Sequence, residues 1–149
     1  MLRKLAMILV LGFMVMATAQ EGLISQESAS DVETTQSKLE AAIEEAGLTL
    51  MTVIDHAANA ENNGLELRPT RVVLFGNPEV GTPLMQAAQS VAIDLPQKML
   101  IWEAEDGTVY AGFNDPEYLK TRHSIEGEDE RLTNVTNALT SLMEAATAP

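Results

Sequence analysis

The sequence contains no cysteine among its 149 residues. Disulfide bonds, thiolate metal sites, cysteine nucleophiles and a lipid-attached cysteine are therefore excluded. Basic residues are also few, with 9 Lys and Arg against 22 Asp and Glu, which gives a formal net charge of −13. Because nucleic acids and anionic lipid surfaces attract positively charged protein faces, we expect neither of them to be a partner of this acidic chain.

No apolar run reaches the ~20 residues that a membrane-spanning helix needs. The longest run, Leu5 to Met16, lies between the basic pair Arg3-Lys4 and the small residues of Ala17-Thr18-Ala19. This pattern predicts that residues 1–19 are a cleaved signal peptide and that residues 20–149 form a single mature domain with a charge of −15 after the two basic residues are removed. We therefore expect a periplasmic or secreted protein without stable membrane insertion after cleavage.

The apolar residues predict two long helices and several strands. One helix is expected over residues 31–46, capped by Ser30, and the other over residues 128–146. Residues 48–55 alternate with both faces largely apolar, which predicts a central strand, and residues 71–75 form a further strand. The last helix carries an apolar stripe of Leu132, Val135, Leu139, Leu142 and Ala146.

A β-hairpin is predicted over residues 98–113, because the turn sequence Glu105-Asp106-Gly107 separates two β-rich runs. Residues 57–64 suit a loop or a short helical turn. Thr82-Pro83 is expected to begin a short helix that ends near residue 90, and Asp115-Pro116 to begin another. This order of elements predicts an α+β fold, a two-layer α/β sandwich in which one mixed or antiparallel sheet has helices packed on one face.

Short motifs occur in a specific order along the mature chain. They are Asp55-His56 with Ala60 and Gly64, Leu67-Arg68-Pro69-Thr70, Phe75-Gly76-Asn77-Pro78, Gly81-Thr82-Pro83-Leu84-Met85, Leu95-Pro96, Trp102, Asp106-Gly107, Asp115-Pro116 and Arg122-His123. Together they resemble the domain of unknown function 302 family over nearly the whole mature chain. The resemblance implies a compact two-layer α/β fold, often exported in bacteria, and no established activity.

The chain has only two histidines, His56 and His123. Imidazole binds metals and changes charge near neutral pH, so one hypothesis is that the two side chains share a metal site. Asp55 or Asp115 would then complete the metal shell or orient an imidazole. The alternative is that both histidines are structural and hydrogen-bond locally where an element ends. Asp55 can support His56 only if the strand ends before Asp55, because successive strand side chains point to opposite faces.

Asn77 lies in a glycine-containing connection between a strand and a helix, and its amide is a candidate to point into a pocket. One hypothesis for function is a binding or sensing module that holds a small molecule or metal near His56, Asn77 and His123. Such a module could act as a monomer or as a homodimer. The alternative is an enzyme that uses His56 or His123 as a general acid or base on a small substrate. The sequence identifies neither a substrate nor a cofactor.

Overall fold

The computed structural model describes residues 20–149, so the predicted signal peptide lies outside the described residues. Within this part of the chain, five strands form one sheet in the order β1-β5-β4-β3-β2, and all neighbouring pairs are antiparallel. The strands are β1 (Leu23–Glu27), β2 (Thr49–Asp55), β3 (Thr70–Gly76), β4 (Gln97–Glu103) and β5 (Val109–Asn114). The helices are α1 (Val32–Glu45), α2 (His56–Glu61), α3 (Pro78–Ala87), the 3-10 helix η1 (Gln89–Ile93), α4 (Pro116–His123) and α5 (Asp129–Thr147).

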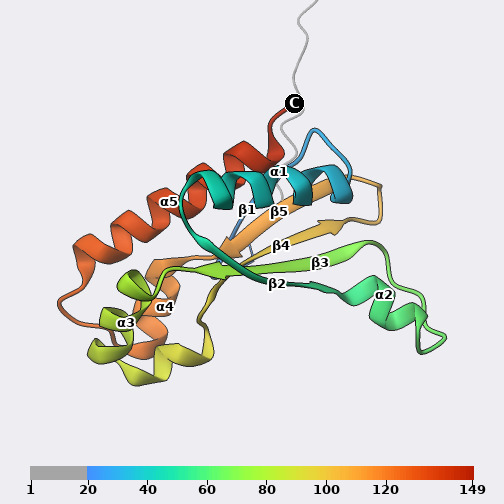
Figure 1. Ribbon diagram of the computed structural model, residues 1–149. Coiled ribbons are helices and arrows are strands. Elements are labelled where there is room, and N and C mark those ends of the chain that lie inside the picture. The colour runs from blue at the N-terminus through green and yellow to red at the C-terminus, as the bar shows by residue number, and fades with distance from the viewer. Residues whose placement is uncertain (1–19) are drawn as a thin grey trace, which may run out of the picture.

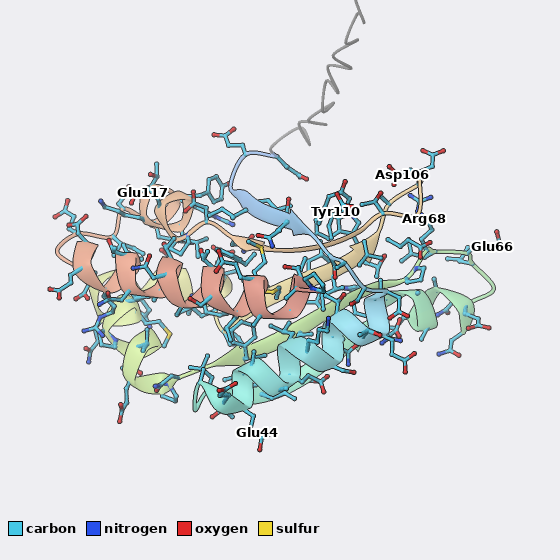
Figure 2. The ribbon with its side chains drawn as sticks, turned by 90° about the horizontal axis from the view of Figure 1, so that it is seen from above. Glu44, Glu66, Arg68, Asp106, Tyr110 and Glu117 are labelled. Carbon is cyan, nitrogen blue, oxygen red and sulfur yellow. The ribbon has the colours of Figure 1, made fainter. Side chains whose placement is uncertain are left out.

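Helices α1 and α5 lie side by side over one face of the sheet (Figures 1 and 2). The core lies between these two layers, so the predicted α+β two-layer architecture is confirmed and the sheet is antiparallel throughout. The stripe predicted on the last helix is buried along its whole length. Side chains at most 2% exposed in this core include Leu39, Ile43, Phe75, Met99, Ile101, Phe113 and Leu139.

The N-terminus of α1 differs from the prediction by one residue. Asp31, not Ser30, is the N-cap, and its Oδ1 accepts a hydrogen bond of 2.7 Å from the backbone N–H of Thr34. The Ser30 hydroxyl oxygen instead accepts a hydrogen bond from Lys38 Nζ. Serine and aspartate cap helices about equally well, so the local sequence does not decide between adjacent candidates.

The predicted central strand is an edge strand, because β2 pairs with β3 on one side only. Leu50 and Met51 are 42% and 50% exposed, and the register shifts between Leu50 and Thr52. The apolar residues on both faces suggested a position between two strands. That prediction was wrong because the place of a strand in a sheet depends on its distant partners, which periodicity does not report.

The local sequence pattern predicts no strand where β1 lies. It pairs with β5 from Leu23 opposite Asn114 to Glu27 opposite Tyr110. The two strands approach closely at Gly112, where a Cβ atom would lie 2.8 Å from the carbonyl oxygen of Ile24. This pairing joins residues more than 80 positions apart in the sequence, so local pattern alone does not predict it.

Helix α3 begins earlier than Thr82-Pro83. Asn77 is the N-cap, its Oδ1 accepts the backbone N–H of Glu79 at 2.9 Å, and Pro78 is the first helical residue. The sequence contains two signals of the same kind, a polar cap followed by proline, and the first one starts the helix. Thr82 and Pro83 lie inside α3, and the chain then continues into η1.

The predicted hairpin and the start of the short helix at Asp115-Pro116 agree with the structure. Strands β4 and β5 form the predicted hairpin, and Trp102 stacks on its cross-strand partner Tyr110 with ring centroids 5.3 Å apart. Helix α4 begins directly after Asp115, and α2 begins one residue before the predicted loop or helical turn and overlaps its first part. None of the helices in the described part of the chain combines the length and the apolar character needed to cross a membrane.

Candidate functional site

His56 and His123 lie at opposite ends of the sheet. His56 is the exposed first residue of α2, next to the start of β3, whereas His123 ends α4, which lies with α3 and η1 beyond the end of β3 (Figure 1). The length of β3 alone separates these ends by ~20 Å. Residues 20–149 contain no group of three or more metal-binding side chains placed to hold an ion. The structure therefore does not form the shared histidine metal site that the sequence suggested.

Asp55 does not orient His56. Strand β2 includes Asp55, whose Oδ2 accepts a 3.0 Å hydrogen bond from Arg71 Nε and whose Oδ1 accepts the backbone N–H of Ala58. The Ala58 bond, and then Arg71, hold the pKa of Asp55 below its usual value against the opposing effect of burial. Gln36 of α1 accepts a further bond from Arg71 Nη1, so Asp55 belongs to a structural network that joins α1, β2 and β3.

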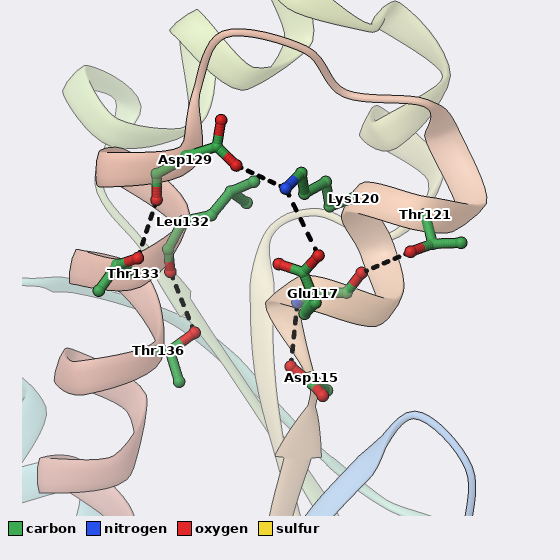
Figure 3. Close-up of polar contacts among 8 residues, drawn as sticks. All are labelled: Asp115, Glu117, Lys120, Thr121, Asp129, Leu132, Thr133 and Thr136. Atoms are coloured by element: carbon green, nitrogen blue, oxygen red, sulfur yellow. Dashed lines mark hydrogen bonds and ion pairs between the residues drawn. The ribbon is translucent and has the colours of Figure 1, made fainter.

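Asp115 is also structural. Its Oδ1 accepts the backbone N–H of Glu117 at 2.9 Å and so caps α4 (Figure 3). Lys120 of the same helix forms ion pairs with Glu117 and with Asp129, the first residue of α5. The contact with Lys120 lowers the pKa of Asp129, and the same contact raises the pKa of Lys120. These bonds hold α4 against the N-terminus of α5 and leave Asp115 away from both histidines.

His123 has two polar partners that the sequence analysis missed. Its Nε2 lies 2.5 Å from Asp94 Oδ2, and its Nδ1 lies 2.9 Å from the hydroxyl oxygen of Ser90. The side chains of His123 and Asp94 are only 6% and 12% exposed. Because an ionised carboxylate only accepts hydrogen bonds, a neutral His123 donates from Nε2 to Asp94 and accepts the Ser90 proton at Nδ1.

Two cations adjoin this cluster. Arg122 Nη1 lies 3.2 Å from Asp94 Oδ1, and Lys98 Nζ donates to the backbone carbonyl of Asp94 at 2.7 Å. Burial lowers the pKa of Lys98, and the negative charge of Asp94 acts in the opposite direction. The partners of His123 are separated from it by 29 and 33 residues, so no local spacing signal in the sequence marks them.

A cleft of about 610 Å³ opens between the N-terminal half of α5 and the end of β3. Its position follows from the fold, because this part of α5 faces the junction where β3 leads into α3 (Figure 1). Several of its apolar residues also belong to the core, so the floor of the cleft is largely buried. The apolar lining consists of Leu48, Phe75, Val80, Val135, Ala138, Leu139 and Leu142.

The rim of this cleft, which we call the α5 cleft, is polar. It carries the side-chain amides of Asn77, Gln97 and Asn134 and the ion pair between Arg131 Nε and Glu128 Oε2, which are 2.7 Å apart. Asn77 uses Oδ1 to cap α3, so its amide N–H groups are free to bond elsewhere. Among the sequence-predicted candidates, Asn77 lines this cleft, whereas Asp55 lines a separate hollow beside α2.

A second cleft, which we call the α3 groove, lies beside the first. It has a volume of about 330 Å³ and shares Gly76, Asn77, Val80 and Gln97 with the α5 cleft. The residues that line it include no charged side chain. Its apolar wall consists of Met51, Leu84, Met85, Ala92, Leu95 and Pro96. The cluster around His123 lines neither cleft.

Comparison with known proteins is consistent with this fold. A family model described as "Domain of unknown function DUF302" matches residues 24–146. The fold is similar to that of an uncharacterised conserved DUF302 protein from Bacillus stearothermophilus, whose crystal structure superposes with a TM-score of 0.77. That match covers 85% of this chain and 99% of the other at 16% sequence identity, so it supports the fold alone.

The chain is also similar to part of longer proteins. It is 40% identical over 104 residues to a protein from Brucella suis biovar 1 named fluoride-specific ion channel FluC 1, and likewise to a protein of that name from Brucella abortus biovar 1. The match covers 70% of this chain but only 41% and 38% of those relatives. The similarity therefore concerns less than half of each relative.

Proposed function

This chain belongs to the DUF302 family, and we propose that it is an exported module that binds a small molecule in the α5 cleft. One observation carries the proposal: a cleft of about 610 Å³ combines an apolar floor with a rim of three side-chain amides. Ligand sites in proteins are commonly concave, mostly apolar and supplied with a few polar groups that orient the ligand. The similarity to part of longer proteins also favours a module that works beside other domains.

The chemistry of the rim indicates the kind of ligand. Arg131 is already paired with Glu128, and Glu130 adds a further negative charge to the lining. An anionic ligand would be repelled by these carboxylates and by the net negative charge of the whole chain, whereas a neutral ligand would not be repelled. We infer a neutral, partly apolar molecule whose polar atoms bond the amides of Asn77, Gln97 and Asn134.

Native mass spectrometry of the protein purified from the cells that produce it tests this function. The wild type should retain a small molecule, and Ala138→Trp should lose it because the indole fills the cleft that Ala138 lines. Ala145→Trp is a matched control, since Ala145 is exposed on the same helix and does not line the cleft. The proposal fails if the wild type carries no ligand or if Ala138→Trp carries it equally well.

The proposed export rests on the N-terminal sequence pattern alone. Cleavage after Ala19 would release a mature protein that begins at Gln20. N-terminal sequencing of the protein from the periplasmic or secreted fraction tests this step. Recovery of a product that still begins at Met1 would contradict export by cleavage.

A second candidate function is acid–base catalysis by His123. The observation that favours it is the hydrogen-bonded chain from Asp94 through His123 to Ser90, in which a carboxylate orients an imidazole that faces a hydroxyl. His56 is less suited to this chemistry because the Asp55 carboxylate is engaged by Arg71 and Ala58.

A fluorophosphonate probe tests this second candidate. Activated serine should form a phosphonyl adduct at Ser90 and release fluoride, and the adduct should be absent in Ser90→Ala and in His123→Ala. An unmodified Ser90 in the wild type would contradict activation of this hydroxyl.

A further inference from the structure

Strand β2 has an unusually unprotected edge. It pairs with β3 on one side, and residues 49–54 include no charged residue although the chain carries 22 acidic residues. Leu50 and Met51 are 42% and 50% exposed on this strand. Edge strands of monomeric proteins are usually protected by charges, proline or a covering segment, because their free backbone groups pair readily with another strand.

An exposed segment, residues 56–69, follows β2 at one end of the molecule. We call it the arm; it consists of α2 and the loop that leads into β3 (Figure 1). Helix α2 has no buried residue, and Leu65 and Leu67 of the loop are 66% and 50% exposed. Figure 2 shows Glu66 and Arg68 of the same loop at this end of the molecule. The two leucines line a shallow hollow with residues such as Asp55 and Arg71 of the same copy, which leaves half or more of each leucine exposed.

The α3 groove lies at the opposite end of β2. Met51, near the start of the strand, contributes to its wall, whereas the arm follows Asp55 at the end of the strand. The groove has the apolar lining and the absence of charge that exposed leucines require. Because the arm and the groove are separated by the length of the strand, the arm of a copy does not reach its own groove.

We propose that two copies of this chain pair through antiparallel β2 strands and that the arm of each copy lies against the α3 groove of the other. A two-fold axis reverses the direction of the second β2, so the end of one strand meets the start of the other. The register shift distorts β2 between Leu50 and Thr52, so pairing should involve residues 52–55. Met51 of one copy then lies opposite the first residue of the other arm.

The charge distribution supports a second copy as the occupant. Two chains with a net charge of −13 repel each other over most of their surfaces. The groove and residues 49–54 carry no charge, and Asp55 is paired with Arg71. The arm carries only Glu61, Glu66 and Arg68, so little of the net charge lies in the proposed contact. Each copy also supplies both the arm and the groove, in the order along β2 that a two-fold pairing needs. The proposed contact is therefore complementary to itself.

The absence of native cysteine permits a direct crosslinking test on the full chain. In the double variant Leu67→Cys with Met85→Cys, the two thiols of one copy lie at opposite ends of the sheet, whereas a disulfide spans only ~4.4–6.8 Å between Cα atoms. Mild oxidation should therefore convert most of this variant into a covalent dimer. The control, Leu67→Cys with Tyr118→Cys, places the second thiol on α4 outside the groove and should crosslink much less.

Sedimentation equilibrium gives an independent result without engineered thiols. The wild type should sediment as a dimer when the protein concentration is roughly micromolar, and also at lower concentrations. The double variant Leu65→Asp with Leu67→Asp should be a monomer that still unfolds in one cooperative urea transition whose midpoint does not depend on protein concentration, while Ala41→Asp on the exposed side of α1 should remain a dimer. A monomeric wild type would overturn the proposal, and so would a dimer that persists in the arm variant and crosslinks equally in both cysteine pairs.

Discussion

His123 Nε2 and Asp94 Oδ2 lie 2.5 Å apart and join the last residue of α4 to the residue that directly follows η1. Both side chains are nearly covered, so this bond is shielded from water. The contact fixes the end of α4 through side chains, while Lys120 and Asp129 fix α4 to α5 on another side (Figure 3). It is the most buried polar contact that involves either histidine.

Removal of the imidazole should therefore cost stability. We expect His123→Ala to lower the free energy of unfolding by about 1.5–3 kcal/mol, because Asp94 loses a charge-assisted hydrogen bond in a covered position. Urea denaturation measures this loss. Ser90→Ala removes only a hydroxyl bond at an exposed residue and should cost about 0.5–1.5 kcal/mol. Equal losses in the two variants would show that the Asp94 bond contributes little.

Leu139 connects the core with the α5 cleft. It is 2% exposed and belongs to the stripe of α5 that packs on the sheet. Leu139→Ala should destabilise the protein by ~2–5 kcal/mol through lost burial and a residual cavity. Chemical denaturation measures the change, with Asn137→Ala on the exposed side of α5 expected to stay within ~0.5 kcal/mol of the wild type. A loss below about 1 kcal/mol for Leu139→Ala would contradict the packing of α5.

Asn77 has two separable roles. Asn77→Ala should remove both the cap of α3, at a cost of ~1 kcal/mol, and the amide donors at the cleft. Asn77→Asp keeps an oxygen that accepts the Glu79 N–H but lacks the amide donors. We expect Asn77→Asp to keep its urea midpoint and to lose the bound molecule in native mass spectrometry. Retention of the ligand by Asn77→Asp would exclude this amide as a ligand contact.

The network at Asp55 predicts a specific pH dependence. The bonds from Ala58 and Arg71 lower the pKa of Asp55 in the folded state. A lowered folded pKa gives stability that is present above the unfolded pKa of about 3.9 and is lost as the pH falls through the folded pKa. Between pH 5 and low pH, the wild type should lose more stability than Asp55→Asn. If the urea midpoints of both proteins fell equally as the pH is lowered over this range, the contribution of Asp55 would be contradicted.

The sequence predicted the elements whose evidence is local. The hairpin of β4 and β5 has its own turn sequence, and the apolar stripe of α5 is complete within one helix. The same reasoning failed for β2, whose apolar residues indicate burial but do not specify the second neighbour that a central strand needs. Strand β1 was not predicted because its pairing partner β5 lies more than 80 residues further along the chain.

The candidate site was predicted only in part. Asn77 was identified from its place between a strand and a helix, and it does line the α5 cleft. The pairing of His56 with His123 was inferred from their scarcity, which carries no information about distance. The actual partners of His123, Asp94 and Ser90, follow from the way α3 and η1 return toward α4, a long-range arrangement that no spacing in the sequence reveals.

The central claim is that the α5 cleft binds a small molecule, and the side-chain amides at its rim allow a direct test. Small molecules released from the purified wild-type protein are added to nitrogen-15-labelled protein that has been stripped of them, and the amide resonances are recorded. We predict that the largest shifts occur in the side-chain amides of Asn77, Gln97 and Asn134 and that they disappear in Ala138→Trp. Shifts confined to other residues, or identical shifts in Ala138→Trp, would contradict the claim.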